Sequence, residues 1–192
     1  MEEHNTINVI RTRRTIRQYR RRPVSSGKIM DIVDAARFAP SARNLQPLEY
    51  IVIDSSGPTE EMFRCMGFGG DTGRLEGKEP AAYIVVLINK NVPSNWCKHD
   101  SGMAIQNMML AAWSKGIASC VLARINRDAI RKLLGVPDCY EIDLVITLGY
   151  PAEESVTEDV GKEDDTAYSR DSKGVLHIPK KRLEDIMHRN RF

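Results

Sequence analysis

The feature that most constrains this fold is an unbroken apolar run over residues 82–88, bounded by Pro80 and Asn89. A short apolar run without polar alternation is typical of a strand buried inside a sheet. The run is too short to cross a bilayer, because a membrane-spanning helix needs about 20 apolar residues. We therefore expect a central, buried strand in a protein that does not span a membrane.

The remaining pattern adds helices and further strands. Helical spacing of apolar residues predicts a helix that opens at Ser25 or Ser26 and is stopped by Pro40. A longer helix is predicted from Asp100 to near Lys115, and we expect it to be buried because it is apolar almost all round. Two further strands are predicted, at 50–53 and at 142–148. Four shorter helices are also predicted: a first helix capped by Asn5 or Thr6, one around 60–66, one capped by Asn126 and ended by Gly135, and one starting near Arg182. Helices and strands without strict alternation predict an α+β arrangement around one sheet, and 192 residues suit a single domain over 1–192.

Charge and cysteine content exclude several classes of protein. The formal net charge is only +2, although residues 11–22 hold seven arginines and residues 152–165 hold seven acids. The acidic stretch predicts a solvated loop, and the basic stretch predicts an anion-binding segment. The four cysteines are widely spaced, and Cys97 with His99 falls far short of a four-ligand metal site. The acidic N-terminus does not open like a signal peptide, so we expect a cytoplasmic protein.

The first candidate site is the segment formed by Arg13, Arg14, Thr15, Ile16 and Arg17. Guanidinium groups match phosphate oxygens and keep their charge, so two arginines with a hydroxyl between them could hold a phosphate. Two alternatives stay open for this segment: a solvated basic face, and an RNA-binding arm that uses residues 11–22.

Three other segments could contact a ligand. Residues 40–47 are a small, polar loop that could bind a planar ligand, or an ordinary loop. Residues 116–120 would let a group approach the backbone closely, or simply lead from a helix cap into a strand. Residues 179–183 place cations at a predicted helix start, where a bound anion would relieve their conflict with the helix dipole; the alternative is a frayed tail.

No protein group stands out as an acid, base or nucleophile. The sequence shows no paired carboxylates, no nucleophile with its base, no P-loop and no G-x-G-x-x-G. Such a chain suits an enzyme whose cofactor performs the chemistry.

Taken in order, these segments resemble the nitroreductase family. The segments that carry the resemblance are 13–17, 39–47, 100–112, 116–120, 148–151 and 180–182. The resemblance implies an α+β fold with a central, mostly antiparallel sheet flanked by helices, in an interlocked homodimer with two FMN sites at the interface. It also implies NAD(P)H as the electron donor.

The resemblance also implies which residues contact FMN. Arg13, Thr15, Lys180 and Arg182 would hold the phosphate, with Arg14 nearby. Arg17 would lie by the pyrimidine edge of the ring. The remaining cofactor-binding positions would be Pro40, Ser41, Ala42 and Asn44 from the partner subunit, and Val121, Leu122 and Ala123 along the ring.

Some positions depart from the family pattern. Thr15 replaces a common serine, Leu48 stands where a tryptophan is frequent, and Ala123 with Arg124 replaces a Glu-Gly pair seen in some members. The loop over 66–78 lacks the Asn and Lys that some relatives direct at the flavin, so its contacts are not assigned.

The expected function is transfer of reducing equivalents from NAD(P)H to a small acceptor, such as a nitroaromatic or a quinone, in a ping-pong scheme. The alternative within this fold is a specialised flavoenzyme, either a reductive dehalogenase or a flavin-fragmenting enzyme. The alternative from another class is the RNA-binding protein, which would need a basic overall charge that this chain lacks. We therefore expect no nucleic-acid partner.

Overall fold

The structure is a computed structural model that describes residues 6–67 and 77–192. The chain divides into two compact units, Met1–Ala152 and Glu153–Phe192, and each is described by itself. The expectation of a single domain over the whole chain stays a prediction.

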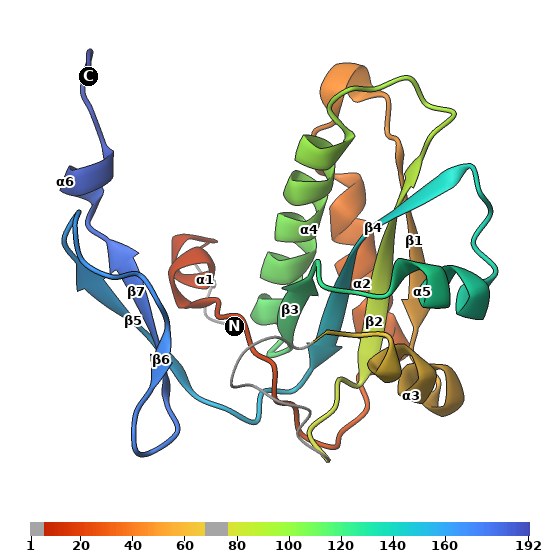
Figure 1. Ribbon diagram of the computed structural model, residues 1–192, viewed down its shortest axis with the longest axis horizontal. Helices are drawn as coiled ribbons and strands as arrows, with labels where there is room; N and C mark the ends of the chain where they lie inside the picture. Colours follow the sequence, from red (N-terminus) through yellow and green to blue (C-terminus); the bar gives the residue numbers. More distant parts are fainter. Residues whose placement is uncertain (1–5, 68–76) are drawn as a thin grey trace. The chain divides into compact units, whose positions relative to one another are not determined.

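The larger unit is built on a four-stranded antiparallel sheet (Figure 1). Its strands are β1 (Leu48–Ile53), β2 (Ala82–Asn89), β3 (Ala118–Leu122) and β4 (Tyr140–Gly149). Their order in the sheet is β1-β2-β4-β3, so β2 is central and β3 forms one edge. Every residue of β2 except Asn89 is buried, which confirms the central strand expected from the apolar run.

Helices cover both faces of this sheet (Figure 1). They are α2 (Ser26–Arg37) and α4 (Cys97–Ser114) on one face, and α3 (Ser56–Arg64) and α5 (Arg127–Leu134) on the other. Helix α1 (Thr6–Thr12) contacts α4 instead, and η1 (Ala42–Asn44) is a 3₁₀ turn. Ile84 and Val86 of β2 pack in one cluster with α2 and α4, whereas Tyr83 and Val85 pack in another with α3 and α5. Neighbouring residues of a strand face opposite sides, so two covered faces explain why β2 is apolar throughout. This arrangement confirms the expected α+β fold.

Helix α4 differs in two ways from its expected form. It begins at Cys97 instead of Asp100, because the backbone carbonyl of Trp96 already accepts the N–H groups of His99 and Asp100. It is also not buried all round, since Met103 is 38% exposed. No helix in the described part of the chain is long and apolar enough to cross a membrane.

A third cluster fixes the N-terminal segment to the edge of the sheet. It joins Ile16 and Tyr19 to Ala118 at the start of β3. The Tyr19 hydroxyl donates to the backbone carbonyl of Ile16 at 2.5 Å and lies 2.7 Å from Oγ1 of Thr147 in β4. The Tyr19 ring also covers Gly149, where an added Cβ would lie 2.7 Å from a ring carbon.

The smaller unit is a three-stranded sheet. Its elements are β5 (Ser155–Val160), β6 (Ser169–Arg170), β7 (Leu176–Lys181) and the short helix α6 (Leu183–Ile186). The strand order is β5-β7-β6, with β5 parallel and β6 antiparallel to β7. The expectation of a loop over residues 152–165 is therefore wrong for β5. Its acidic side chains stay exposed, and its order comes from backbone pairing with β7.

We expect Gly149→Ala to destabilise the protein by about 1–3 kcal/mol, because the new methyl group must displace the Tyr19 ring from a packed site. Urea unfolding at fixed protein concentration would measure the change in free energy.

The matched control is Gly27→Ala in α2, where an added Cβ meets nothing within 4 Å. This control should be neutral or slightly stabilising. Equal effects of the two substitutions would show that Tyr19 does not exclude a side chain at Gly149.

Candidate functional site

The arginine segment lies against the edge of the sheet. Thr15 forms an isolated parallel bridge with Ser119 of β3, and the Ile16 N–H donates to the Ser119 carbonyl at 3.1 Å. Ile16 is buried, whereas Thr15 and Arg17 are half-buried. Side chains alternate along an extended segment, so Thr15 and Arg17 lie on the opposite side of the backbone from the buried Ile16.

Arg13 is the most unusual residue of this segment. It is half-buried, and its Nη1 atom has no hydrogen-bond partner among residues 6–67 and 77–192. Burial lowers the pKa of Arg13, and the adjacent charge of Arg14 lowers it further. A guanidinium stays protonated in proteins, and the causes of this lowered pKa include no counter-charge from the described part of the chain. A bound anion would supply both the charge and the missing acceptor.

Arg14 is bound to the backbone of its own segment. Its Nη1 donates to the backbone carbonyls of Arg11 at 2.7 Å and Arg13 at 3.0 Å. Cations suit the C-terminal end of a helix, so this contact caps α1. We infer that Arg14 contributes mainly through its charge beside Arg13.

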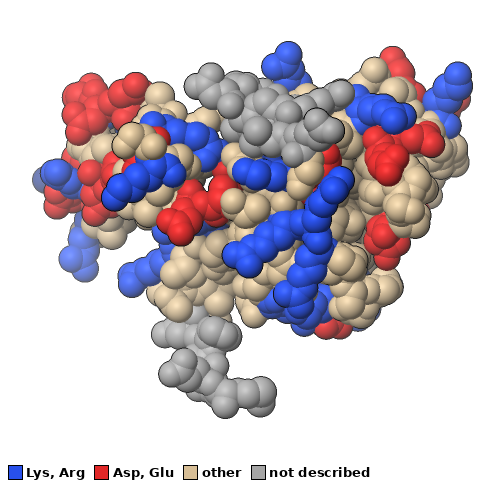
Figure 2. All heavy atoms as spheres, turned by 90° about the horizontal axis from the view of Figure 1, so that it is seen from below, with Lys and Arg blue, Asp and Glu red and all other residues tan. Residues whose placement is uncertain are grey.

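The rest of the basic stretch is part of the folded surface. Arg20 donates from Nε to the carbonyl of Pro151 at 2.9 Å, and the Arg22 guanidinium lies 4.2 Å from the centre of the Tyr150 ring. Figure 2 shows basic and acidic side chains interspersed on the face that it draws. Residues 11–22 therefore do not form the free basic arm that the RNA-binding alternative requires.

The segment after α4 meets the arginine segment at the same edge. Gly116 adopts φ 73°, which ends the helix as expected and leads into β3. Val121 and Leu122 continue β3 beyond Ser119, and Ala123 follows as an exposed residue. The structure thus brings the first and third predicted segments together at β3.

The polar loop over 40–47 is strained. Arg43 and Asn44 adopt φ 55°, and Gln46 adopts φ 49°. A non-glycine residue in this left-handed region costs on the order of 1–3 kcal/mol, and such residues cluster at functional sites. The Ser41 hydroxyl accepts the Gln46 N–H at 3.1 Å, which helps to close the loop.

Asp100 holds this loop onto α4. Its Oδ1 accepts the N–H of Ala42 at 3.0 Å, and its Oδ2 is buried with no partner among the described residues. Sequence reasoning used Asp100 only as a helix start and missed this role. The signal for this role was an acidic residue in a largely apolar helix, because a buried carboxylate is almost always paired with another polar group. Pro40 and Ser41 also line a small cavity of about 80 Å³ beside Asp100.

The loop and the arginine segment are held at opposite ends of α4. At one end Trp113 Nε1 donates to Thr12 Oγ1 at 3.1 Å, and at the other Asp100 holds Ala42. Thirteen residues separate Asp100 from Trp113, which corresponds to about 20 Å along the helix. One chain therefore does not bring these two segments around the same part of a ligand.

The fourth predicted segment, residues 179–183, lies in the smaller unit. The expectation that its cations stand at a helix start is wrong for Lys180 and Lys181, which end β7; only Arg182 stands at the N-cap of α6. Since α6 has four residues, it offers little helix dipole for the cations to oppose. All three cations are exposed, as an anion-binding role requires.

The same strand carries a histidine between two acids. His177 Nδ1 lies 2.5 Å from Glu158 Oε1 of β5, and its Nε2 lies 3.5 Å from Asp171 Oδ2. The contact with Glu158 raises the pKa of His177 against the opposing effect of burial, and the carboxylate of Asp171 raises it further. Arg170 forms an ion pair with Glu153 in the same unit.

We expect the smaller unit to lose stability as pH rises through the raised pKa of His177. A group with a raised pKa stabilises the fold fully below its unfolded value of about 6.5 and loses this effect above its folded value. The measurement is the protection of β7 amides against hydrogen exchange, corrected for intrinsic rates, over a pH series.

His177→Gln should remove this pH dependence, whereas His99→Gln in the larger unit should retain it. A pH dependence that survives His177→Gln would assign it to another group.

Comparison with known proteins gives a consistent result. A family model described as the nitroreductase family matches residues 10–64 and 69–150. A protein of Archaeoglobus fulgidus, provisionally named NADH dehydrogenase/NAD(P)H nitroreductase, is 36% identical over 80% of this chain and 88% of its own length.

Two solved structures extend the comparison to the fold. A Parabacteroides distasonis protein, with the same provisional name, has a TM-score of 0.69 and 31% identity over 78% of this chain and 88% of its own. A protein of Clostridium difficile R20291, named FMN-dependent nitroreductase, has a TM-score of 0.71 and 26% identity over 97% of this chain and 99% of its own. The expected nitroreductase-type fold is confirmed.

Proposed function

This chain belongs to the nitroreductase family, and from that premise we propose that it uses FMN to carry reducing equivalents from NAD(P)H to a small nitroaromatic or quinone acceptor. Family membership and the names of the relatives support a general oxidoreductase. The observation that carries the finer proposal is Arg13, whose buried Nη1 has no partner in the described part of the chain.

The residues around Arg13 fit a terminal phosphate. Arg13 offers an unsatisfied donor, Arg14 adds a second charge, and Thr15 follows on the same segment. Phosphate oxygens match the guanidinium fork, and the contact is strengthened by charge. The contribution of Lys180 and Arg182 to the phosphate, which the resemblance implies, stays a prediction. The sequence has no G-x-G-x-x-G segment for an adenine dinucleotide, which favours FMN over FAD.

The flavin ring would extend along the edge of β3. Val121, Leu122 and Ala123 would line one side of it, and Arg17 would lie at the pyrimidine edge. When bound, FMN supplies the capacity to accept a hydride and to release two electrons to an acceptor. A positive charge at the pyrimidine edge stabilises the negative charge that reduction creates there, so Arg17 would favour reduction.

A second copy of the chain would complete the site. The loop with Pro40, Ser41, Ala42 and Asn44 lies about 20 Å along α4 from the arginine segment of its own chain. A partner chain could bring its own copy of this loop to the flavin.

We expect Arg13→Ala to weaken FMN binding about ten- to a hundredfold, because one charge-assisted hydrogen bond to phosphate contributes about 1.5–3 kcal/mol. The stability of the apo-protein should be unchanged or slightly higher, since the variant removes a half-buried charge without a counter-charge. Fluorescence titration of the apo-protein with FMN measures the affinity, and thermal unfolding measures the stability.

Arg21→Ala is the matched control, because Arg21 is an exposed arginine outside the segment that contacts β3. It should leave the affinity for FMN nearly unchanged. Equal losses in the two variants would attribute binding to general basicity and would contradict a phosphate site at Arg13.

A two-chain flavin site predicts complementation between defective chains. Arg13→Ala damages the phosphate side, and Asp100→Ala releases the loop that Ala42 anchors. In a heterodimer of these variants, one site combines both undamaged sides and the other combines both damaged ones. Co-expression with two tags and measurement of flavin absorbance should therefore show about half of the wild-type FMN content.

Each homodimeric variant, purified in parallel at the same FMN concentration, is the reference for this measurement. Sites formed within single chains would give the heterodimer only the average of the two low values. That result would contradict shared sites while leaving the phosphate contact of Arg13 intact.

A further inference from the structure

We propose that a pocket between η1 and the start of α4 binds small aromatic anions, which Arg43 and Trp96 select as acceptors. The pocket has a volume of about 260 Å³. This volume lies just below the usual range of about 300–1,000 Å³ for small-molecule sites, so the pocket suits a small ligand with a single ring. Its lining residues are Ala42, Arg43, Leu45, Pro93, Ser94, Asn95 and Trp96.

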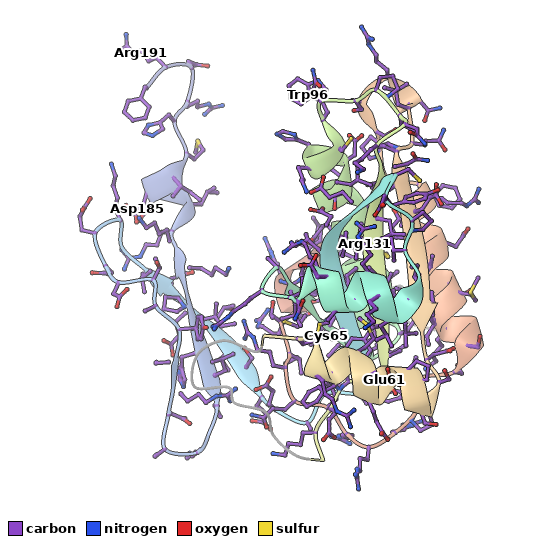
Figure 3. The ribbon with its side chains drawn as sticks, turned by 45° about the vertical axis from the view of Figure 1, so that its right-hand side comes forward. Glu61, Cys65, Trp96, Arg131, Asp185 and Arg191 are labelled. Atoms are coloured by element: carbon purple, nitrogen blue, oxygen red, sulfur yellow. The ribbon has the colours of Figure 1, made fainter. Side chains whose placement is uncertain are left out.

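Trp96 presents a large aromatic surface in a fixed place. Its side chain is 58% exposed, at the N-terminal end of α4 and away from α3 (Figure 3). Its N–H donates to Ser94 Oγ at 3.2 Å, and its ring packs against His99 with the ring centres 5.1 Å apart. An indole held in place by its backbone and one neighbour can stack on an aromatic ligand with little loss of its own freedom.

Arg43 supplies the only charge among the residues that line the pocket. It is exposed, and no hydrogen bond or ion pair links it to another residue of the described chain. Its left-handed backbone, with φ 55°, is unusual for a long side chain and indicates that the loop conformation is imposed by its surroundings. No carboxylate lines the pocket, so the guanidinium is available to an anionic ligand.

The two side chains together define the class of ligand. A neutral aromatic compound would stack on Trp96 but make no charged contact with Arg43. An aliphatic anion would pair with Arg43 but gain little from the indole. A planar aromatic carboxylate can make both contacts, while Leu45 and Pro93 add apolar surface.

The position of the pocket connects it to the reaction, and this connection rests on the proposed function. Ala42 lines the pocket and also donates its N–H to Asp100. It belongs to the loop that we assign to the flavin of the partner chain. An aromatic anion bound here would therefore lie next to that flavin site, where an acceptor must arrive.

The test compares 3-nitrobenzoate with its neutral methyl ester. Calorimetric titration of the oxidised protein, without any reductant, measures the affinity for each compound. Arg43→Gln should weaken binding of the acid about five- to tenfold and leave the ester unchanged, since only the acid has a charge to lose. Trp96→Leu should weaken both compounds about two- to tenfold, because both stack. Arg21→Gln, at an exposed position outside the pocket, should change neither affinity.

Turnover and flavin content separate this inference from the proposed function. With NAD(P)H present, Arg43→Gln should lower kcat/KM for the acid relative to the ester by the same five- to tenfold factor, with normal flavin absorbance. The inference is overturned if the wild-type protein binds neither compound, or if Arg43→Gln affects acid and ester equally. A protein without flavin or reductase activity would overturn the proposed function, yet the calorimetric contrast would still decide whether the pocket selects aromatic anions.

Discussion

Tyr19 is fully buried, and its hydroxyl finds partners only where the N-terminal segment crosses β3 and β4. A buried hydroxyl without a partner costs about 1–3 kcal/mol, so this contact strongly restricts the path of the chain. Thr147 continues the network by donating to the carbonyl of Cys120. The ring needs the space that Gly149 leaves free. The arginines therefore reach the edge of β3 because a tyrosine six residues beyond Arg13 is anchored in the sheet.

Helix α4 sets the second constraint, because it is the element that both candidate segments contact. Its N-terminal end holds the strained loop through Asp100, and its C-terminal end holds α1 through Trp113. A straight helix fixes this separation more firmly than a loop could. Asp143 of β4 also accepts hydrogen bonds from Lys98 and Ser101, so the first turn of α4 is attached to the sheet. The proposed site, which uses both segments, would then be assembled from two chains.

Features that depend on local or periodic signals could be predicted from the sequence. The apolar run identified β2, and Asn126 caps α5 by accepting the Ala129 N–H, as its side chain predicts. Gly135 ends α5 with φ 63°. Features that depend on a distant partner were missed. The acidic strand β5 has little apolar pattern and is ordered by its pairing with β7, while Lys180 and Lys181 lie in that ladder instead of opening a helix.

The candidate site also divides into residues that could be recognised from their type and residues whose role depends on a distant contact. Arg13 and Thr15 could be singled out because their residue types suit a phosphate, whatever the path of the backbone. Asp100 and Trp96 could not, since a helix N-terminus accommodates an acid or an aromatic residue for many reasons. Only the contact of Asp100 with Ala42, and the exposure of Trp96 beside Arg43, give these residues a role.

The groups best suited to hold ligands are also those that weaken the free chain. Among the described residues, Arg13 keeps a buried donor without a partner and Asp100 keeps a buried acceptor without one. The loop also holds Arg43 in a left-handed conformation. Each of these features costs free energy that packing elsewhere must offset. A ligand that binds only the folded state stabilises that state and so offsets part of this cost. The stabilisation is about 2.7 kcal/mol when the ligand concentration is a hundred times its Kd. The strain in this chain is then best understood as a consequence of binding, because a sequence selected for stability alone would have paired the arginine and relaxed the loop.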